Sequence, residues 1–102
     1  MVDAAADPPI VCTLEADAAP ARLDEWKSVL DHVVARRAMP DGVMLQFPRD
    51  PEVLASLTSV ATKEVACCSF FTFTLTIDAN AARVAVVAPD DGVPLVRELF
   101  GR

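Results

Sequence analysis

The sequence predicts an α/β (α+β) two-layer sandwich, and three features of the chain support this fold class. Several short segments alternate apolar and polar residues, which is typical of strands with one buried face. Between them, apolar residues recur at helical spacing, as expected for helices that cover such a face. With 102 residues and 53% apolar residues, the chain is long enough to form one domain with its own core. We expect the order β-α-β-α-β-β-α, with a mixed sheet, all helices on one face and a C-terminal antiparallel hairpin.

The first part of the chain predicts a strand followed by a helix. Ile10 to Leu14 alternates in hydropathy, which places Cys12 on the apolar face of a short strand. The helix is expected to end before Pro40, with the adjacent Arg36 and Arg37 near its C-terminal end, where the helix dipole favours cations. Its apolar stripe is formed by Leu23, Trp26, Leu30 and Val33.

The second part of the chain predicts a strand, a long helix, a hairpin and a last helix. Gly42 to Phe47 alternates as a strand, and a helix begins at Asp50-Pro51 with a wide apolar face that includes Glu64. Residues 71–77 and 83–88 alternate on either side of a turn, which predicts an antiparallel hairpin. The last helix is expected to pack Leu95, Leu99 and Phe100.

The face of the sheet opposite the helices is expected to be open and rich in Thr. A half-apolar face of this kind suits a contact with a second copy of the chain, so a homodimer is one expected partner. The residues expected on it are Val11, Thr13, Met44, Gln46, Thr72, Thr74, Thr76, Ala85 and Val87.

Composition excludes several classes of protein. The net charge of −6 and the absence of a basic stripe argue against a nucleic-acid partner, which would need clustered Lys and Arg. Residues 1–9 lack the basic start of a secretory signal and are expected to be a disordered tail, which leaves residues 10–102 as a single domain. No segment is long and apolar enough for a membrane span. Three cysteines without an export signal fit free thiols in the cytoplasm.

Adjacent cysteines mark the expected functional site. Cys67 and Cys68 lie where the second helix ends, and Glu64 lies one helical turn before them, so all three side chains can reach one patch. Cys12 joins this patch if the helix covers the first strand. Three sulfurs and one carboxylate suit soft or borderline ions such as Hg(II), As(III), Zn(II) or Cd(II).

Two other interpretations of the cysteines stay open. Free cysteine is often buried as a small apolar residue, so the pair can simply fill the core. A reactive catalytic thiol needs a nearby positive charge, whereas this pair lies at the negative end of a helix beside Glu64. The only histidine, His32, lies off the apolar stripe, which weakens a Cys-His catalytic interpretation. A carboxylate on an apolar face also needs a partner, for which Lys63 and Arg22 are the candidates.

The run from Glu64 to Phe70, Glu-x-x-Cys-Cys-x-Phe, resembles a motif of small bacterial proteins of poorly assigned function. Together with Cys12-Thr13-Leu14 and Leu99-Phe100-Gly101, it is also similar to the C-terminal segments of some MerR-type heavy-metal-responsive regulators. The resemblance covers most of residues 9–101, although Ser69 stands where a proline is expected. It implies sensing of, or resistance to, soft metals.

Three classes of function therefore stay open. The first is a cytoplasmic metal-binding module that uses Cys12, Cys67 and Cys68, with Glu64 as a fourth ligand or as a partner of the ligands. The second is a thiol-dependent enzyme acting on an organometal or in a redox step. The third is a domain without ligand that forms dimers and merely packs its cysteines.

Overall fold

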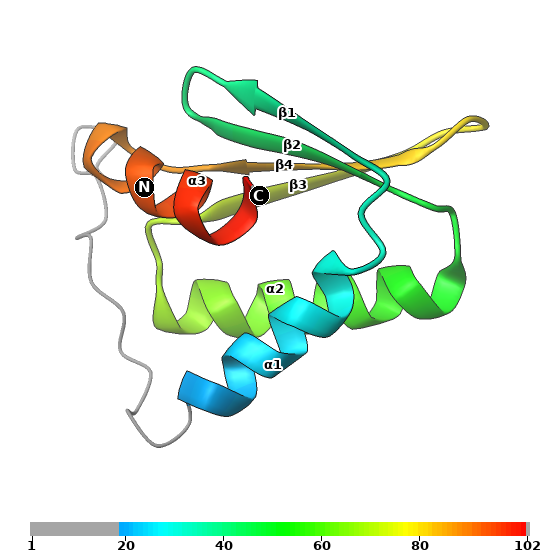
Figure 1. Ribbon diagram of the computed structural model, residues 1–102, viewed down its shortest axis with the longest axis horizontal. Helices are drawn as coiled ribbons and strands as arrows, with labels where there is room; N and C mark the ends of the chain where they lie inside the picture. The colour runs from blue at the N-terminus through cyan, green and yellow to red at the C-terminus, as the bar shows by residue number, and fades with distance from the viewer. Residues whose placement is uncertain (1–18, 102) are drawn as a thin grey trace, which may run out of the picture.

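The computed structural model describes residues 19–101, which form three α-helices and one four-stranded sheet (Figure 1). The strand order in the sheet is β1-β2-β4-β3, and every neighbouring pair is antiparallel. Along the chain the elements are α1 (Ala19–Leu30), β1 (Ala35–Met39), β2 (Gly42–Phe47), α2 (Pro51–Cys67), β3 (Thr72–Ile77), β4 (Ala82–Val87), the short 3-10 helix η1 (Asp90–Gly92) and α3 (Val93–Phe100).

Two hairpins build the sheet. The first joins β1 to β2 through a turn at Pro40 and Asp41, with Met39 opposite Gly42. Gly42 is required there because a Cβ atom would collide with the main-chain carbonyl of Val86 on the neighbouring strand. The second joins β3 to β4, with Ile77 opposite Ala82.

The helices lie on one side of the sheet, and the core lies between the two layers (Figure 1). Strands β2 and β4 each bury alternate residues against the helices, because successive side chains of a strand point to opposite faces. Helix α2 contributes one apolar stripe, and α1 packs against α2. The largest fully buried side chains are Phe47, Phe100, Leu45, Leu57, Val60, Val84, Val86 and Val96.

This architecture confirms the α+β class, the second hairpin and the position of α2, but the predicted mixed sheet and order of elements are wrong. The sheet from 19 to 101 is wholly antiparallel rather than mixed, so its strands are not linked by parallel crossovers. The order in this part of the chain begins with a helix and gains a strand, which gives α-β-β-α-β-β-α. The predicted strand Ile10 to Leu14 lies outside the described residues.

The additional strand is β1, which we had predicted as the end of the first helix. Helix α1 ends at Leu30, and the amides of His32 and Val33 donate to carbonyls three residues back, which tightens the last turn. The β-branched residues that follow favour extended backbone, and the chain then pairs with β2. Arg36 and Arg37 are therefore residues of an edge strand and not of a helix terminus.

Helix α3 packs differently from the prediction. Val96 and Phe100 are buried, whereas Leu95 and Leu99 are each 36% exposed. The helix is held to the first hairpin by polar contacts, since Arg97 Nη2 donates to the carbonyl of Met39 at 2.8 Å and Arg36 Nε donates to the carbonyl of Phe100 at 3.1 Å. Of the three core residues predicted for this helix, Leu95, Leu99 and Phe100, only Phe100 is buried.

Candidate functional site

The C-terminal end of α2 brings together the polar groups on which the site depends. The helix ends at Cys67, and the amide of Cys68 donates to the carbonyl of Glu64 at 2.6 Å. Cys68 has non-helical backbone, and the chain turns through Ser69 into β3. This helix has neither a glycine after its end nor a basic residue in its last turn. Its polar partners come instead from α1.

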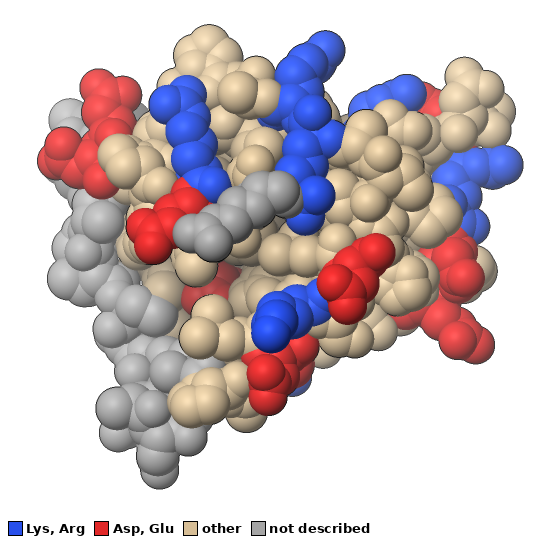
Figure 2. All heavy atoms as spheres, viewed as in Figure 1, with Lys and Arg blue, Asp and Glu red and all other residues tan. Residues whose placement is uncertain are grey.

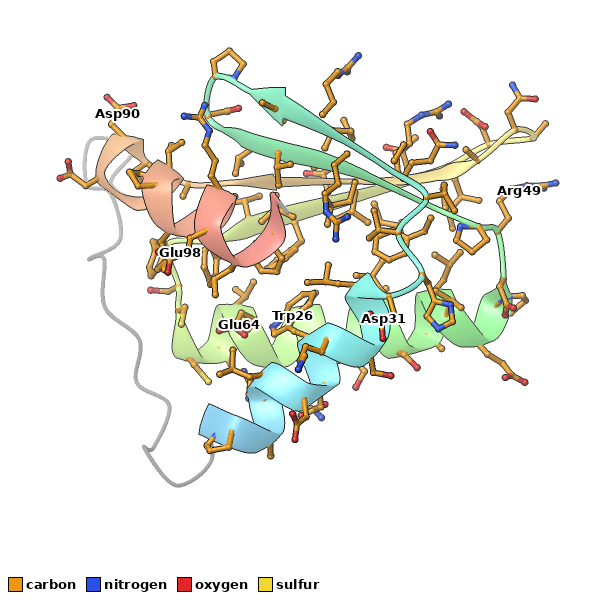
Figure 3. All side chains as sticks on the ribbon, in the orientation of Figure 1. Trp26, Asp31, Arg49, Glu64, Asp90 and Glu98 are labelled. Atoms are coloured by element: carbon orange, nitrogen blue, oxygen red, sulfur yellow. The ribbon has the colours of Figure 1, made fainter. Side chains whose placement is uncertain are left out.

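Glu64 is the buried carboxylate of this end of the helix, with 6% of its surface exposed. Trp26 Nε1 of α1 points to Glu64 (Figure 3) and donates to its Oε1 at 2.6 Å. Arg22 Nη1 lies 3.5 Å from the same oxygen. A buried carboxylate is costly unless it is paired and hydrogen-bonded, and both conditions hold here. Of the two partners that the sequence suggested, Arg22 is the correct one, because Lys63 pairs with Glu25 at 2.8 Å.

Arg22 connects the carboxylate to a sulfur atom. Its Nη1 lies 3.6 Å from Cys67 Sγ as well as 3.5 Å from Glu64 Oε1, so one guanidinium group faces both side chains. Desolvation by burial lowers the pKa of Arg22, but the hydrogen bond to Cys67 and the charges of Glu64 and Cys67 outweigh it and raise the pKa above its ordinary value. The sequence predicted a negative environment for the cysteines and missed this positive charge.

The cysteines differ in burial and in bonding. Cys67 is half-buried, whereas Cys68 is 3% exposed and belongs to the core cluster. Cys68 is disulfide-bonded, so the prediction that all cysteines are free thiols is wrong for this residue. Cys12 lies outside the described residues, and its approach to the pair stays a prediction. His32 is exposed, as predicted.

The structure thus brings together Glu64 and Cys67 through Arg22, with Cys68 as the next residue of the chain. Within residues 19–101, no group of three or more His, Cys, Asp or Glu side chains is arranged to hold a metal ion. A metal site that combines Cys12 with Cys67 and Cys68 therefore stays a proposal. The contact between Arg22 and Cys67 could not be found from sequence, because it depends on how α1 crosses α2.

The charged groups on the outside do not extend this site into a patch of one sign. Figure 2 shows Lys and Arg side chains on the same face as Asp and Glu side chains.

No helix in the described part of the chain is long and apolar enough to cross a membrane.

Comparisons with known proteins give no relatives for this chain. No family model matches it, and neither a curated protein nor a solved structure matches it. The interpretation of the site therefore depends on its own residues.

Proposed function

We propose that the C-terminal end of α2 is a thiol site for soft metal or metalloid ions, with Hg(II) and As(III) preferred over Zn(II) and Cd(II), in sensing or resistance. The observation that supports the proposal is that the guanidinium of Arg22 lies 3.6 Å from Cys67 Sγ. A second cysteine, Cys68, follows Cys67 directly in the sequence. Thiolates are the ligands that soft ions prefer. A fixed cation beside the sulfurs compensates for the negative charge that accumulates when several thiolates bind one ion.

The preference for As(III) and Hg(II) follows from the engaged carboxylate. Glu64 Oε1 already accepts hydrogen bonds from Trp26 and Arg22, so we assign Glu64 the role of holding Arg22 beside Cys67 rather than of a metal ligand. Structural Zn(II) sites use four ligands. A complex with three sulfurs suits As(III) and Hg(II) better, and Cys12 is the proposed third sulfur.

Binding requires reduction of the disulfide of Cys68, because a metal binds the thiolate form of cysteine. The proposed activity therefore belongs to the reduced protein, and oxidation closes the site. The proposal therefore requires conditions that keep cysteines reduced.

The test is a titration of the reduced protein with Hg(II), arsenite and Zn(II), with thiols counted in parallel. We expect one tightly bound equivalent of Hg(II) or arsenite that protects three thiols, and a loss of affinity in both Cys67→Ser and Cys68→Ser. Cys12→Ser reports the third sulfur separately, since it should lower the number of protected thiols to two. Unchanged affinity in Cys67→Ser and in Cys68→Ser would refute the proposal.

A second candidate function is formation of a homodimer through the open face of the sheet. Thr72, Thr74 and Thr76 are exposed on this face, and Ala85 lies half-buried opposite Thr74 on β4. Such a face is uncharged along β3 and suits packing against a second sheet. Thr74→Asp should then shift the protein from dimer to monomer in sedimentation, whereas Thr58→Asp on the exposed side of α2 should not. A monomeric wild-type protein would refute this candidate.

A further inference from the structure

An apolar cavity of about 250 Å³ lies beside the thiol end of α2. Its walls come from α1, α3 and Glu64 of α2, with Trp26 and Phe100 buried and Leu23 and Leu99 exposed. Trp26 and Phe100 are in contact at 4.8 Å between ring centroids, which gives the cavity an aromatic wall. Leu30 completes the apolar part of the lining.

The cavity is connected to Cys67 through one shared side chain, that of Arg22. Arg22 and Glu64 line the cavity, and the same Arg22 Nη1 lies 3.6 Å from Cys67 Sγ. A ligand atom bound at the sulfur is therefore next to the guanidinium that borders the cavity. The charges of Arg22 and Glu64 compensate each other, and Lys27 is the remaining charged residue of a lining whose surface is mainly apolar.

The size of the cavity fits an aromatic ring. An apolar protein cavity of about 150 Å³ stays dry and binds benzene, and the cavity here is larger at about 250 Å³. Binding sites for small molecules combine an apolar lining with a few placed polar groups. Here the polar groups of the lining are Arg22, Glu64 and Lys27, and Cys67 Sγ lies next to Arg22.

We propose that this cavity holds the organic group of an aryl-substituted thiophilic ion, such as phenylarsonous acid, whose arsenic atom is bound by the cysteines. The inference rests on the proposed function and specifies its ligand class. Two thiols react with the two hydroxyl groups on arsenic, so that two As–O bonds break, two As–S bonds form and two molecules of water leave. The arsenic stays trivalent, and no oxidant or reductant takes part in this step.

The test compares phenylarsonous acid, methylarsonous acid and arsenite on the reduced protein. Trp26 is the only tryptophan of the chain and lines the cavity, so its fluorescence reports the ligand directly. The affinities of dithiothreitol for the phenyl and methyl compounds serve as the reference. Their ratio gives the preference of a small dithiol that has no cavity. Relative to that reference, we expect the protein to prefer the phenyl compound by about tenfold, the gain from burying several apolar groups.

A matched pair of variants in α3 locates the ring. Leu99 and Leu95 are each 36% exposed, and of the two only Leu99 lines the cavity. Leu99→Gln should reduce the preference for phenyl by about three- to tenfold, because it places an amide against the ring, whereas Leu95→Gln should leave the preference unchanged. A phenyl preference equal to that of dithiothreitol, or equal effects of the two variants, would overturn this inference alone. Failure of all three arsenicals to bind would overturn the proposed function and this inference together.

Discussion

The carboxylates of Asp78 and Glu64 are each held by several donors, and the donors come from different places in the chain. Asp78 accepts from the amides of Asn80 at 2.8 Å and Ala81 at 3.0 Å, and it pairs with Arg83 at 2.9 Å, so every partner lies within five residues. Glu64 accepts instead from Trp26 and Arg22, which lie 38 and 42 residues away.

The two clusters therefore serve different purposes. The Asp78 cluster is exposed and closes the turn between β3 and β4, which is a local task. The Glu64 cluster is buried, joins α1 to α2 and places Arg22 beside Cys67. Removing a buried polar group whose partners lie far away in the sequence lowers the stability of the fold more than removing an exposed one. Such a group also fixes how the two helices are arranged around a site. This contrast makes the Glu64 cluster the candidate for function.

The largest expected effect is that of Glu64→Leu. The variant leaves the guanidinium of Arg22 and the indole N–H of Trp26 without their shared acceptor, and breaking a buried pair in this way costs about 3 kcal/mol. Urea unfolding followed by circular dichroism measures the loss. Asp78→Ala is the control for an exposed cluster, and a loss in Glu64→Leu no greater than in this control would contradict the contrast.

A smaller loss is expected from Trp26→Phe. The ring still packs against Phe100 and stacks on Phe73, whose centroid lies 5.6 Å away, but the donor to Glu64 is gone. Glu64 Oε1 keeps only the longer contact with Arg22, and the loss of a hydrogen bond to a buried charged acceptor costs about 1–2 kcal/mol. The same substitution made in Glu64→Leu should cost less, because the hydrogen bond is already absent. Equal costs in the two backgrounds would show that the hydrogen bond does not couple α1 to α2.

Asp50→Ala tests a local polar contact at the other end of α2. Asp50 caps the helix by accepting from the amide of Glu52 at 2.9 Å. Removing such a cap costs about 1 kcal/mol, measured by the same urea unfolding. Arg49→Ala, at the preceding exposed residue, should have almost no effect. An effect of Asp50→Ala larger than that of Glu64→Leu would reverse the proposed order.

The smallest effect is expected from acidification at Asp78. Hydrogen bonds from Asn80 and Ala81 and then the pairing with Arg83 lower the pKa of this carboxyl below its ordinary value of 3.8. A lowered folded pKa stabilises the turn above the unfolded pKa, and this stabilisation is lost as the pH falls through the folded pKa. The protection of the Asn80 and Ala81 amides, taken relative to the intrinsic exchange rate at each pH, should therefore fall only below about pH 4. A loss of protection already at pH 6 would contradict the assignment.

The sequence predicted the local features of the fold well. The start of α2 at Asp50-Pro51 and the hairpin of β3 and β4 are confirmed, because their signals lie in a few adjacent residues. Strand β1, with the sequence Ala-Arg-Arg-Ala-Met, has no strong strand propensity and depends on pairing with β2, so sequence alone assigned it to a helix.

The candidate site was predicted only in part, because it also depends on contacts between segments that are far apart in the sequence. Glu64 on an apolar stripe indicated a buried carboxylate in need of a partner, and Arg22 was one of two named candidates. The approach of Arg22 to Cys67 follows from the packing of α1 on α2, which no short segment encodes. Whether Cys12 joins the site stays a prediction, because it lies outside the described residues.

Native mass spectrometry of the reduced protein with one equivalent of arsenite tests the central proposal most directly. Each As–S bond that forms removes one thiol proton, so the mass of the adduct counts the sulfurs on arsenic. We predict one arsenic with the loss of three protons in the wild type, and two As–S bonds with one retained hydroxyl group in Cys12→Ser. No adduct in the wild type, or an unchanged adduct in Cys67→Ser and Cys68→Ser, would contradict a thiol site at the end of α2.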